Sequence, residues 1–445
     1  MASFDLILRN AHVFSPAGLE EADLALAGGR IAALLGRGAG EAGETIDCTG
    51  LTILPGVIDT QVHFREPGLE HKEDLESGSR AAVLGGVTAL FEMPNTNPLT
   101  DTADALADKL ARAKGRMWCD HAFYAGATPG NADHCAALEA LPGCSGIKVF
   151  MGASTGNLLV PDDETLSRVL ASGRRRVAIH AEDEPRLQAR RDFRVEGDPS
   201  THPVWRDDES AMLATRRAVT LARRHGRQVH ILHVTTPAEL EYLKDNKDIA
   251  SCEVTPQHLT LAGEEAYPRL GTLAQMNPPI RSGAHRAGLW HWLRQGVPDV
   301  VGSDHAPHTL EEKAKPYPQS PAGMPGVQTL LPLLLHHMLE GRLTLARLVD
   351  LTSSGAQRLF HIAGKGRIAA GYDADLSVVD LNGRFIVTKD WLASRCGWSP
   401  FEGMELKGRV VGTMVRGHRV MWEGALLGTP LGAPIRFEEV IRERA

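Results

Sequence analysis

The chain lacks the features that mark secreted, membrane-spanning and disulfide-rich proteins. Its six cysteines among 445 residues form no Cys-x-x-Cys pair, which is typical of a reduced protein rather than a disulfide framework. No apolar run reaches the roughly 18 residues that a membrane span requires, and the first residues hold no apolar signal core. We therefore predict a cytoplasmic protein with no membrane partner.

A large positive surface is also absent. The formal net charge is −7 and no long stripe of Lys and Arg occurs, which argues against nucleic acid as a partner. The short basic clusters at 174–176 and 223–224 are interpreted as solvated helix ends and strand starts. Hydrophobic residues make up 43% of the chain and charged residues 23%, so the composition is that of a globular protein with a large core.

From Thr52 onward, apolar strands alternate with amphipathic helical stretches, which is the pattern of repeated βα units. The length alone suggests about three domains, but an α/β barrel takes roughly 250 residues, so one barrel plus a smaller domain fits as well. The pattern predicts an α/β fold with a (β/α)8 TIM-type barrel. Its eight candidate strands are 52–63, 87–93, 118–124, 146–151, 177–180, 229–234, 249–255 and 300–304.

The two ends of the chain have a different sequence pattern, in which short predicted strands are separated by turn signals. The simplest account is that both ends build one small β-sandwich domain beside the barrel. We predict that residues 1–54 and 364–445 form this domain and that residues 55–363 form the barrel.

Several of the predicted barrel strands end in residues that can bind a metal or a substrate. Near residue 60 an apolar run passes into alternating polar residues, so Gln61, His63 and Arg65 project from one face of a strand end. Parallel barrel strands end at one rim, where imidazole and carboxylate groups suit a catalytic zinc ion. Four more strands end in candidates for the same centre, namely Lys148, His180, His233 and Asp304.

Lys148 is the unusual member of this set, because an ammonium group cannot coordinate a metal. Burial beside cations favours the neutral amine, which can react with carbon dioxide to give a carbamate that bridges two ions. The alternative is a buried salt bridge to an Asp or Glu. The residue type alone leaves both interpretations open.

The chain resembles the cyclic amidohydrolases, and among them the dihydroorotase group, over essentially its whole length. The resemblance rests on an ordered set of motifs: DTQVHFREPG at 59–68, FEMPNTNP at 91–98, GIKVFMGAS at 146–154, AIHAED at 178–183, ILHVTT at 231–236, EVTPQHL at 253–259, MNPPIR at 276–281, GSDHAPHT at 302–309, DADLSVVD at 373–380 and PFEGMELKGRV at 400–410. The resemblance implies the barrel and flanking β domain, and a zinc-dependent hydrolysis of dihydroorotate to N-carbamoyl-aspartate.

The resemblance also implies a role for each candidate. Carboxylated Lys148 would bridge the ions, His180 and His233 would hold one zinc, and His63 and Asp304 would hold the other. Asp304 would also be the catalytic base that passes a proton to the leaving nitrogen. The implied substrate-binding residues are Arg65, which suits a carboxylate, with Asn95, Asn277, His308 and Gly323.

The chain departs from the family pattern at Gln61, where the family usually has a second histidine. A glutamine carbonyl is a poorer zinc ligand, so we expect one or two zinc ions per chain. Two alternatives stay open: a hydantoinase- or allantoinase-type enzyme, or a non-catalytic subunit that partners aspartate transcarbamoylase. The family also implies a homo-oligomer, either a dimer or a tetramer.

Overall fold

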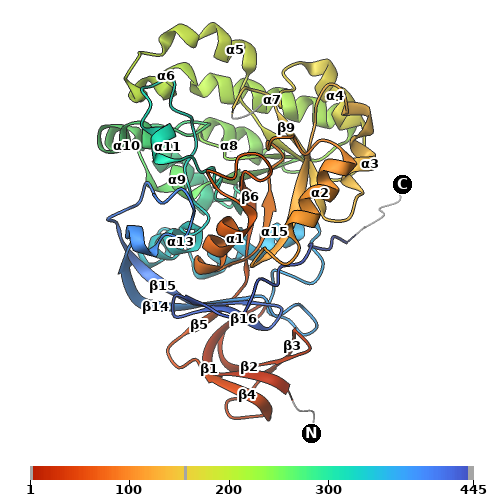
Figure 1. The fold of residues 1–445 in the computed structure, drawn as a ribbon, viewed down its shortest axis with the longest axis vertical. Coiled ribbons are helices and arrows are strands. Elements are labelled where there is room, and N and C mark those ends of the chain that lie inside the picture. The colour runs from red at the N-terminus through yellow and green to blue at the C-terminus, as the bar shows by residue number, and fades with distance from the viewer. Residues whose placement is uncertain (1–3, 155–157, 439–445) are drawn as a thin grey trace.

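Eight parallel strands form a barrel whose helices surround it, and a mixed sheet lies beside the barrel (Figure 1). This computed structural model describes residues 4–154 and 158–438. The predicted fold class is confirmed. The barrel strands are β6 (Val57–Val62), β7 (Val87–Glu92), β8 (Asp120–Gly126), β9 (Cys144–Phe150), β10 (Val177–His180), β11 (Val229–Ile231), β12 (Ala250–Val254) and β13 (Val300–Val301).

The barrel strands follow one another in chain order, and the barrel closes where the first strand meets the segment after the last. The main-chain N–H of His63 donates to the carbonyl of His305 at 2.7 Å, and Val62 and His305 form a parallel bridge. Because all eight strands run the same way, their carboxyl ends share one rim.

The helices owe their positions to capping residues and apolar faces. In α7 (Asp208–His225), the carboxylate of Asp207 accepts a hydrogen bond from the N–H of Ser210, and Gly226 ends the helix in the left-handed conformation. The other α-helices are α1 (Leu75–Leu84), α2 (Ala103–Ala113), α3 (Cys135–Glu139), α4 (Asp163–Ala171), α5 (Glu184–Ala189), α6 (His202–Trp205), α8 (Pro237–Lys244), α9 (Pro256–Thr260), α10 (Gly263–Leu270), α11 (Gly283–Arg294), α12 (Leu310–Lys313), α13 (Leu330–Leu339), α14 (Leu345–Val349) and α15 (Gly355–Phe360).

Both ends of the chain contribute to one nine-stranded mixed sheet, as expected. The ends join where β5 pairs antiparallel with β14, with Leu54 opposite Ser377. In Figure 1 the C-terminal strands lie between the barrel and β1–β4, and β15 packs against α13. The strands are β1 (Phe4–Ser15), β2 (Gly18–Ala27), β3 (Arg30–Leu35), β4 (Ala42–Asp47), β5 (Thr52–Pro55), β14 (Leu376–Ile386), β15 (Glu405–Val415), β16 (His418–Trp422) and β17 (Ala425–Leu426).

The structure corrects the prediction of a single strand over residues 52–63. The chain passes from β5 in the mixed sheet to β6 in the barrel, with Gly56 between them. A side chain at Gly56 would collide with Thr88, so the chain crosses between the two sheets where it has no Cβ. Both strands are apolar and buried, so the periodicity alone could not separate them.

A buried ionic cluster joins the barrel to the mixed sheet. The ammonium of Lys365 lies 2.6 Å from Asp120 of β8, 2.5 Å from Asp375 and 3.2 Å from Asp373. Arg416, at the end of β15, also contacts Asp120. The three carboxylates lie close enough together to suggest a metal site, but Lys365 already supplies the cation among them.

We predict that Lys365→Met lowers the free energy of unfolding by about 3–5 kcal/mol, because it leaves buried carboxylates without their cation. Chemical denaturation monitored by circular dichroism measures the change. The matched control is Lys407→Met, which removes an exposed pair with Glu340 and should change the free energy of unfolding far less. Equal losses in the two variants would contradict a structural role for the cluster.

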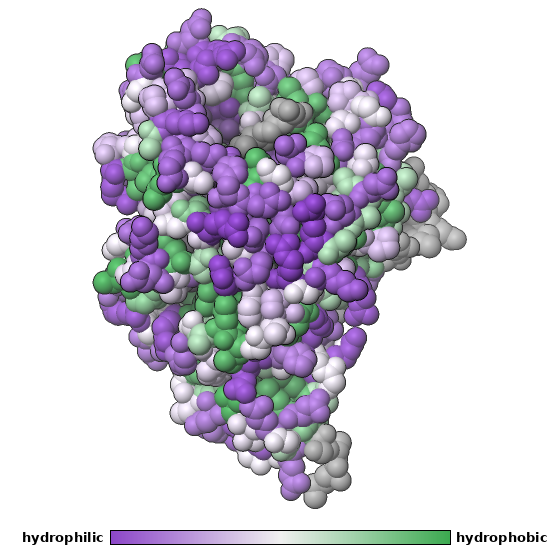
Figure 2. Space-filling view, viewed as in Figure 1, coloured by the Kyte–Doolittle hydropathy of each residue, from purple (hydrophilic) through white to green (hydrophobic). Residues whose placement is uncertain are grey.

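Within the described residues, no helix is long and apolar enough to cross a membrane. On the face drawn in Figure 2, hydrophilic side chains cover much of the barrel helices, and hydrophobic side chains occur in small groups among them.

Candidate active site

The sequence-predicted site residues come together at the carboxyl ends of the barrel strands. Nine of them line one cavity: Gln61, His63, Arg65, Asn95, His180, His233, Asn277, Asp304 and Gly323. The other two, Lys148 and His308, are fully buried directly behind its wall. The same cavity is also lined by Phe150, Ser154, Ala306 and Ala322, which the sequence did not single out.

The centre of the site is a pair of histidines on neighbouring strands. Nδ1 of His180, at the end of β10, lies 3.0 Å from Nε2 of His233, just beyond β11. The other ring nitrogen of His180 lies 2.9 Å from a carboxylate oxygen of Glu182, which orients the ring. Burial lowers the pKa of both histidines, so both rings are neutral and can offer a lone pair.

Glu182 is itself held by a buried arginine. Arg206 donates to the Oε2 atom of Glu182 at 2.8 Å, and both side chains are almost wholly enclosed. Burial alone would raise the pKa of Glu182, but Arg206 and His180 outweigh it and hold that pKa well below its usual range. The carboxylate is therefore charged and keeps His180 in a fixed orientation.

Lys148 of β9 is the only lysine among the predicted site residues, and it is completely buried. Its ammonium nitrogen has no hydrogen-bond partner in the described part of the chain and lies 4.4 Å from the centre of the Phe150 ring. Burial lowers its pKa to about 7, although Asp304 and Glu253 act in the opposite direction. The alternative of a direct buried salt bridge is wrong, because no carboxylate contacts the Lys148 nitrogen in residues 4–154 and 158–438.

Asp304 contacts two side chains from the end of β6, that of Gln61 within the strand and that of His63 directly after it. Nε2 of His63 lies 3.2 Å from its Oδ1 atom, and the side-chain amide of Gln61 donates to the same oxygen at 3.1 Å. The opposite ring nitrogen of His63 lies 2.7 Å from Oδ1 of Asn95. Gln61 thus uses its amide N–H on the carboxylate, and its Oε1 atom is buried without a partner among the described residues.

Arg65 reaches the rim from the loop after β6. Its backbone is left-handed, with φ of 67°, a conformation that His233 and Asp304 also adopt, with φ of 37° and 42°. Such conformations cost on the order of 1 kcal/mol or more and are concentrated at functional sites. The Nε atom of Arg65 donates to the carbonyl of Pro307 at 3.1 Å. Its Nη1 atom is buried without a partner among the described residues.

His308 lies behind Arg65, with its Nε2 atom 3.4 Å from the Nη2 atom of Arg65. Burial lowers the pKa of His308 to about 3, so the ring is neutral beside the guanidinium. Lys72 lies 3.2 Å from its other ring nitrogen. Because His308 is neutral and Nη1 of Arg65 has no partner among the described residues, the guanidinium of Arg65 is a charged donor in the cavity wall.

Two loops complete the opposite wall. Asn277 is oriented by Nε2 of His202, which lies 2.9 Å from its Oδ1 atom. Gly323 donates its N–H to the carbonyl of Gln275 at 2.9 Å, with φ of 145°, and a side chain there would collide with Ala306. Glycine therefore lets the backbone of this loop approach the cavity.

Sequence reasoning missed three residues that hold the site in place. Glu182 stands two residues after His180 in the AIHAED motif, so its position was a usable signal. Arg206 comes from a loop more distant in the chain, and no sequence signal pointed to it. Lys313 of α12 donates to the carbonyls of Gln275 and Gly323 at 3.2 and 3.1 Å, and so ties both loops together.

The donor set fits a divalent metal at the histidine pair. Two neutral imidazole nitrogens lie 3.0 Å apart, a few tenths of an ångström short of the roughly 3.3 Å between two nitrogen ligands of a tetrahedral zinc ion, and an unpartnered amine is buried nearby. The second position, between His63 and Asp304, has fewer donors, because the N–H of the Gln61 amide faces the carboxylate.

Comparison with known proteins gives a consistent result. The amidohydrolase family model matches residues 52–420. A dihydroorotase of Halobacterium salinarum is 39% identical over 86% of this chain and 89% of that protein, and an allantoinase of Rubrobacter xylanophilus is 35% identical over the full length of both. The solved structure of an L-hydantoinase from Arthrobacter aurescens superposes with a TM-score of 0.92 at 31% identity, covering 97% of this chain and 100% of that one.

The chain belongs to the amidohydrolase family, and the resemblance seen in its motifs is confirmed. Its relatives show a hydrolytic enzyme of the cyclic amidohydrolase group. Their names divide between dihydroorotase, allantoinase and hydantoinase, so the group is shared while the ring that is opened differs.

We predict that Glu182→Gln lowers the free energy of unfolding of the metal-free protein by about 3–5 kcal/mol at pH 7, because Arg206 loses its buried partner. The native pKa of Glu182 is depressed, so the stability it contributes is present above its unfolded pKa of about 4.3 and is lost on acidification. The difference in the free energy of unfolding between wild type and variant should therefore narrow as the pH falls below about 4.3.

Urea denaturation in the presence of a chelator, repeated from neutral to acidic pH, measures this gap. The control is Glu265→Gln on α10, because Glu265 is an exposed glutamate whose one ion pair within the described residues is a long contact with Arg286. A gap that stays constant with pH would show that the charge of Glu182 does not carry the effect.

Proposed function

We propose that the protein is a zinc-dependent dihydroorotase, which reversibly hydrolyses (S)-dihydroorotate to N-carbamoyl-L-aspartate in pyrimidine biosynthesis. The observation that carries the proposal is Arg65, a buried guanidinium with an unpartnered edge in the same cavity as the histidine pair. A guanidinium binds a carboxylate through two parallel hydrogen bonds. Among the rings that the relatives' names imply, dihydroorotate is the one that carries a carboxylate.

The metal would be held by residues of five strand ends, those of β6, β9, β10, β11 and β13. Carboxylated Lys148, His180 and His233 would hold the inner ion, and His63 with Asp304 would hold an outer one with weak help from Gln61. When bound, zinc lowers the pKa of water toward about 7 and polarises a carbonyl. The low pKa of Lys148 supports the carbamate, because only a neutral amine reacts with carbon dioxide.

The residues of the chain supply the rest of the chemistry. Arg65 binds the substrate carboxylate, and Asn95, Asn277, His308 and the backbone at Gly323 position the ring. The carboxylate of Asp304 accepts a proton from the attacking water and returns it to the ring nitrogen as the amide C–N bond breaks. The neutral rings of His180 and His233 stay fixed because Glu182 and the barrel strands hold them.

We further propose that the enzyme is cytoplasmic and homo-oligomeric. A non-catalytic partner of aspartate transcarbamoylase remains the alternative, but His180, His233 and Arg65 line one cavity and Lys148 is buried, which favours an active enzyme. Hydrolysis of hydantoin or allantoin is the competing activity. The relatives named allantoinase and L-hydantoinase are the reason to include both compounds in the assay below.

We expect the zinc-loaded protein to hydrolyse dihydroorotate with a kcat/KM far above that for dihydrouracil, the same ring without its carboxylate. Arg65→Met should lower kcat/KM for dihydroorotate by at least about 30-fold, because a charged hydrogen-bonded pair of this kind contributes about 2–5 kcal/mol. The preference for dihydroorotate over dihydrouracil should collapse by a similar factor. Steady-state assays of ring opening measure both substrates.

The matched control for Arg65→Met is Arg384→Met, which removes an exposed arginine of β14 and should leave both activities unchanged. A zinc-loaded wild type that opens hydantoin or allantoin but not dihydroorotate would overturn the substrate assignment. A zinc-loaded protein that opens none of these rings would overturn the enzyme proposal itself.

We predict that Gln61→His raises zinc content from about one ion per chain toward two, because an imidazole adds a strong donor beside His63 and Asp304. Inductively coupled plasma mass spectrometry on protein dialysed against a zinc buffer measures the content. Gln319→His adds the same imidazole at an exposed position and controls for adventitious binding. Unchanged zinc content in Gln61→His would mean that Gln61 does not border the outer site.

A further inference from the structure

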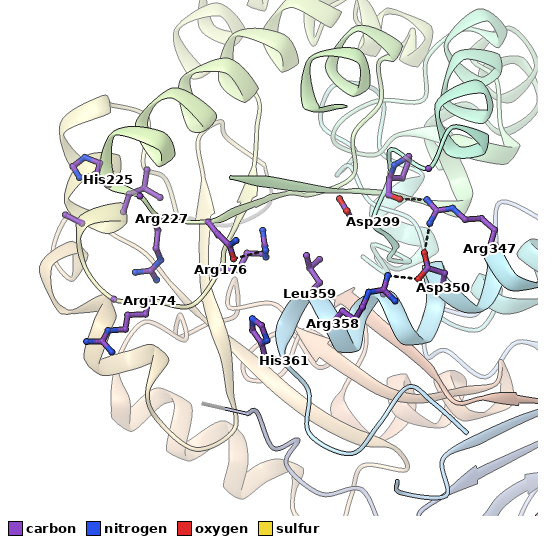
Figure 3. A pocket seen from close by; sticks show the side chains of 18 residues that line it. Arg174, Arg176, His225, Arg227, Asp299, Arg347, Asp350, Arg358, Leu359 and His361 are labelled. Atoms are coloured by element: carbon purple, nitrogen blue, oxygen red, sulfur yellow. Dashed lines mark hydrogen bonds and ion pairs between the residues drawn. The ribbon is translucent and has the colours of Figure 1, made fainter. Parts of the chain in front are cut away.

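A second cavity, of about 990 Å³, lies at the opposite end of the barrel from the proposed active site. Its walls come from the segments that precede β10, β11 and β13, and from α14 and α15. Figure 3 shows the side chains of Arg176, Arg358, Leu359 and His361 around its middle. None of these residues takes part in the proposed hydrolysis.

Arg174 and Arg176 line this cavity, and Arg175 between them lines the neighbouring one. The guanidinium of Arg176 donates to the carbonyl of Val229 at 3.0 Å and to the side-chain oxygen of Gln228 at 2.9 Å, both of them neutral. Its Nε atom is buried and has no partner in the described chain. Arg175 donates to the carbonyl of Cys144 and packs on the ring of Phe437. The carboxylate of Glu139 accepts hydrogen bonds from the main-chain N–H groups of Arg174 and Arg175 and is paired with Arg227, but among the described residues no carboxylate forms an ion pair with a guanidinium of this run.

The other wall also carries more cations than anions. Arg347 and Arg358 share a single carboxylate, that of Asp350, at 2.6 Å each. The second carboxylate of this cavity, Asp299, is paired with Lys247 at 2.6 Å. Both carboxylates that line the cavity are therefore already neutralised, and positive charge is left over on two sides.

This excess is unusual because the whole chain has a net charge of −7. A half-enclosed guanidinium loses hydration, and neutral acceptors compensate for that loss less fully than a carboxylate does. Burial lowers the pKa of Arg176 to about 10, with Asp299 opposing the shift. An anion in the cavity would supply the missing partner. His225 adds a buried ring nitrogen, Nε2, that has no partner among the described residues.

We propose that this cavity binds a multivalent phosphate anion, namely the diphosphate or triphosphate group of a small molecule. Guanidinium groups on two walls suit an anion with several charges and several acceptor oxygens, because each can bind phosphate oxygens through paired hydrogen bonds. The cavity has the size of a small-molecule site. Leu359 adds an apolar surface between the charged walls, where the rest of such a molecule can lie.

Isothermal titration calorimetry with pyrophosphate and with tripolyphosphate, at constant ionic strength, tests the proposal. We expect saturable binding to the wild type, weakened at least about tenfold in Arg176→Gln and again in Arg358→Gln from the opposite wall. Arg358 is half exposed, so its variant keeps the test valid even when Arg176→Gln proves unstable. Thermal melts of each variant establish that it is folded.

The matched control is Arg384→Gln, which removes the same charge from an exposed position in the mixed sheet and should bind like the wild type. Titration with ATP and with adenosine distinguishes a nucleotide from a free polyphosphate: tighter binding of ATP than of tripolyphosphate identifies the former, and equal binding the latter. No saturable binding to the wild type, equal weakening in Arg384→Gln, or tighter binding of citrate than of pyrophosphate would overturn the proposal.

Discussion

Nδ1 of His180 lies 3.0 Å from Nε2 of His233, and the rest of the site is arranged around this pair of imidazoles. The contact exists because β10 and β11 are parallel neighbours in a closed barrel, so their carboxyl ends cannot diverge. Glu182 fixes one ring, and Arg206 fixes Glu182. A chain of buried, charge-assisted contacts therefore sets the orientation of the His180 ring, while His233 is placed by its position directly after β11.

The molecule treats buried charge in two different ways. In the cluster that joins barrel and sheet, the ammonium of Lys365 is surrounded by carboxylates, and nothing remains for a ligand to satisfy. At Lys148, Arg65 and Arg176, buried nitrogen atoms have no partner within the described residues. An unpaired buried polar group is costly, so each of these positions is a candidate for contact with a ligand. The first two belong to the proposed active site, and the third lies at the other end of the barrel.

Much of this organisation could be predicted from the sequence. The alternation of strands and helices from Thr52 predicted the barrel, because each strand had to bury both faces. The position of His180, His233 and Asp304 after apolar runs predicted that they meet, since parallel strands end at one rim. The prediction of one continuous strand over 52–63 was wrong. The residues on both sides of Gly56 are apolar, so their pattern does not show that the chain leaves one sheet and enters another there.

The sequence by itself determined the fold class, the family and the residue types of the proposed metal centre, because these depend on local periodicity and on short ordered motifs. Only the tertiary structure decided the partners: that Arg206 holds Glu182, that Lys313 ties two loops, and that Lys148 has no carboxylate beside it among the described residues. The arginines at 174–176, which we interpreted as a solvated strand start, line a cavity with wall residues from nearly 200 positions further along the chain. Such contacts join segments that are distant in the chain, and no pattern of neighbouring residues encodes them.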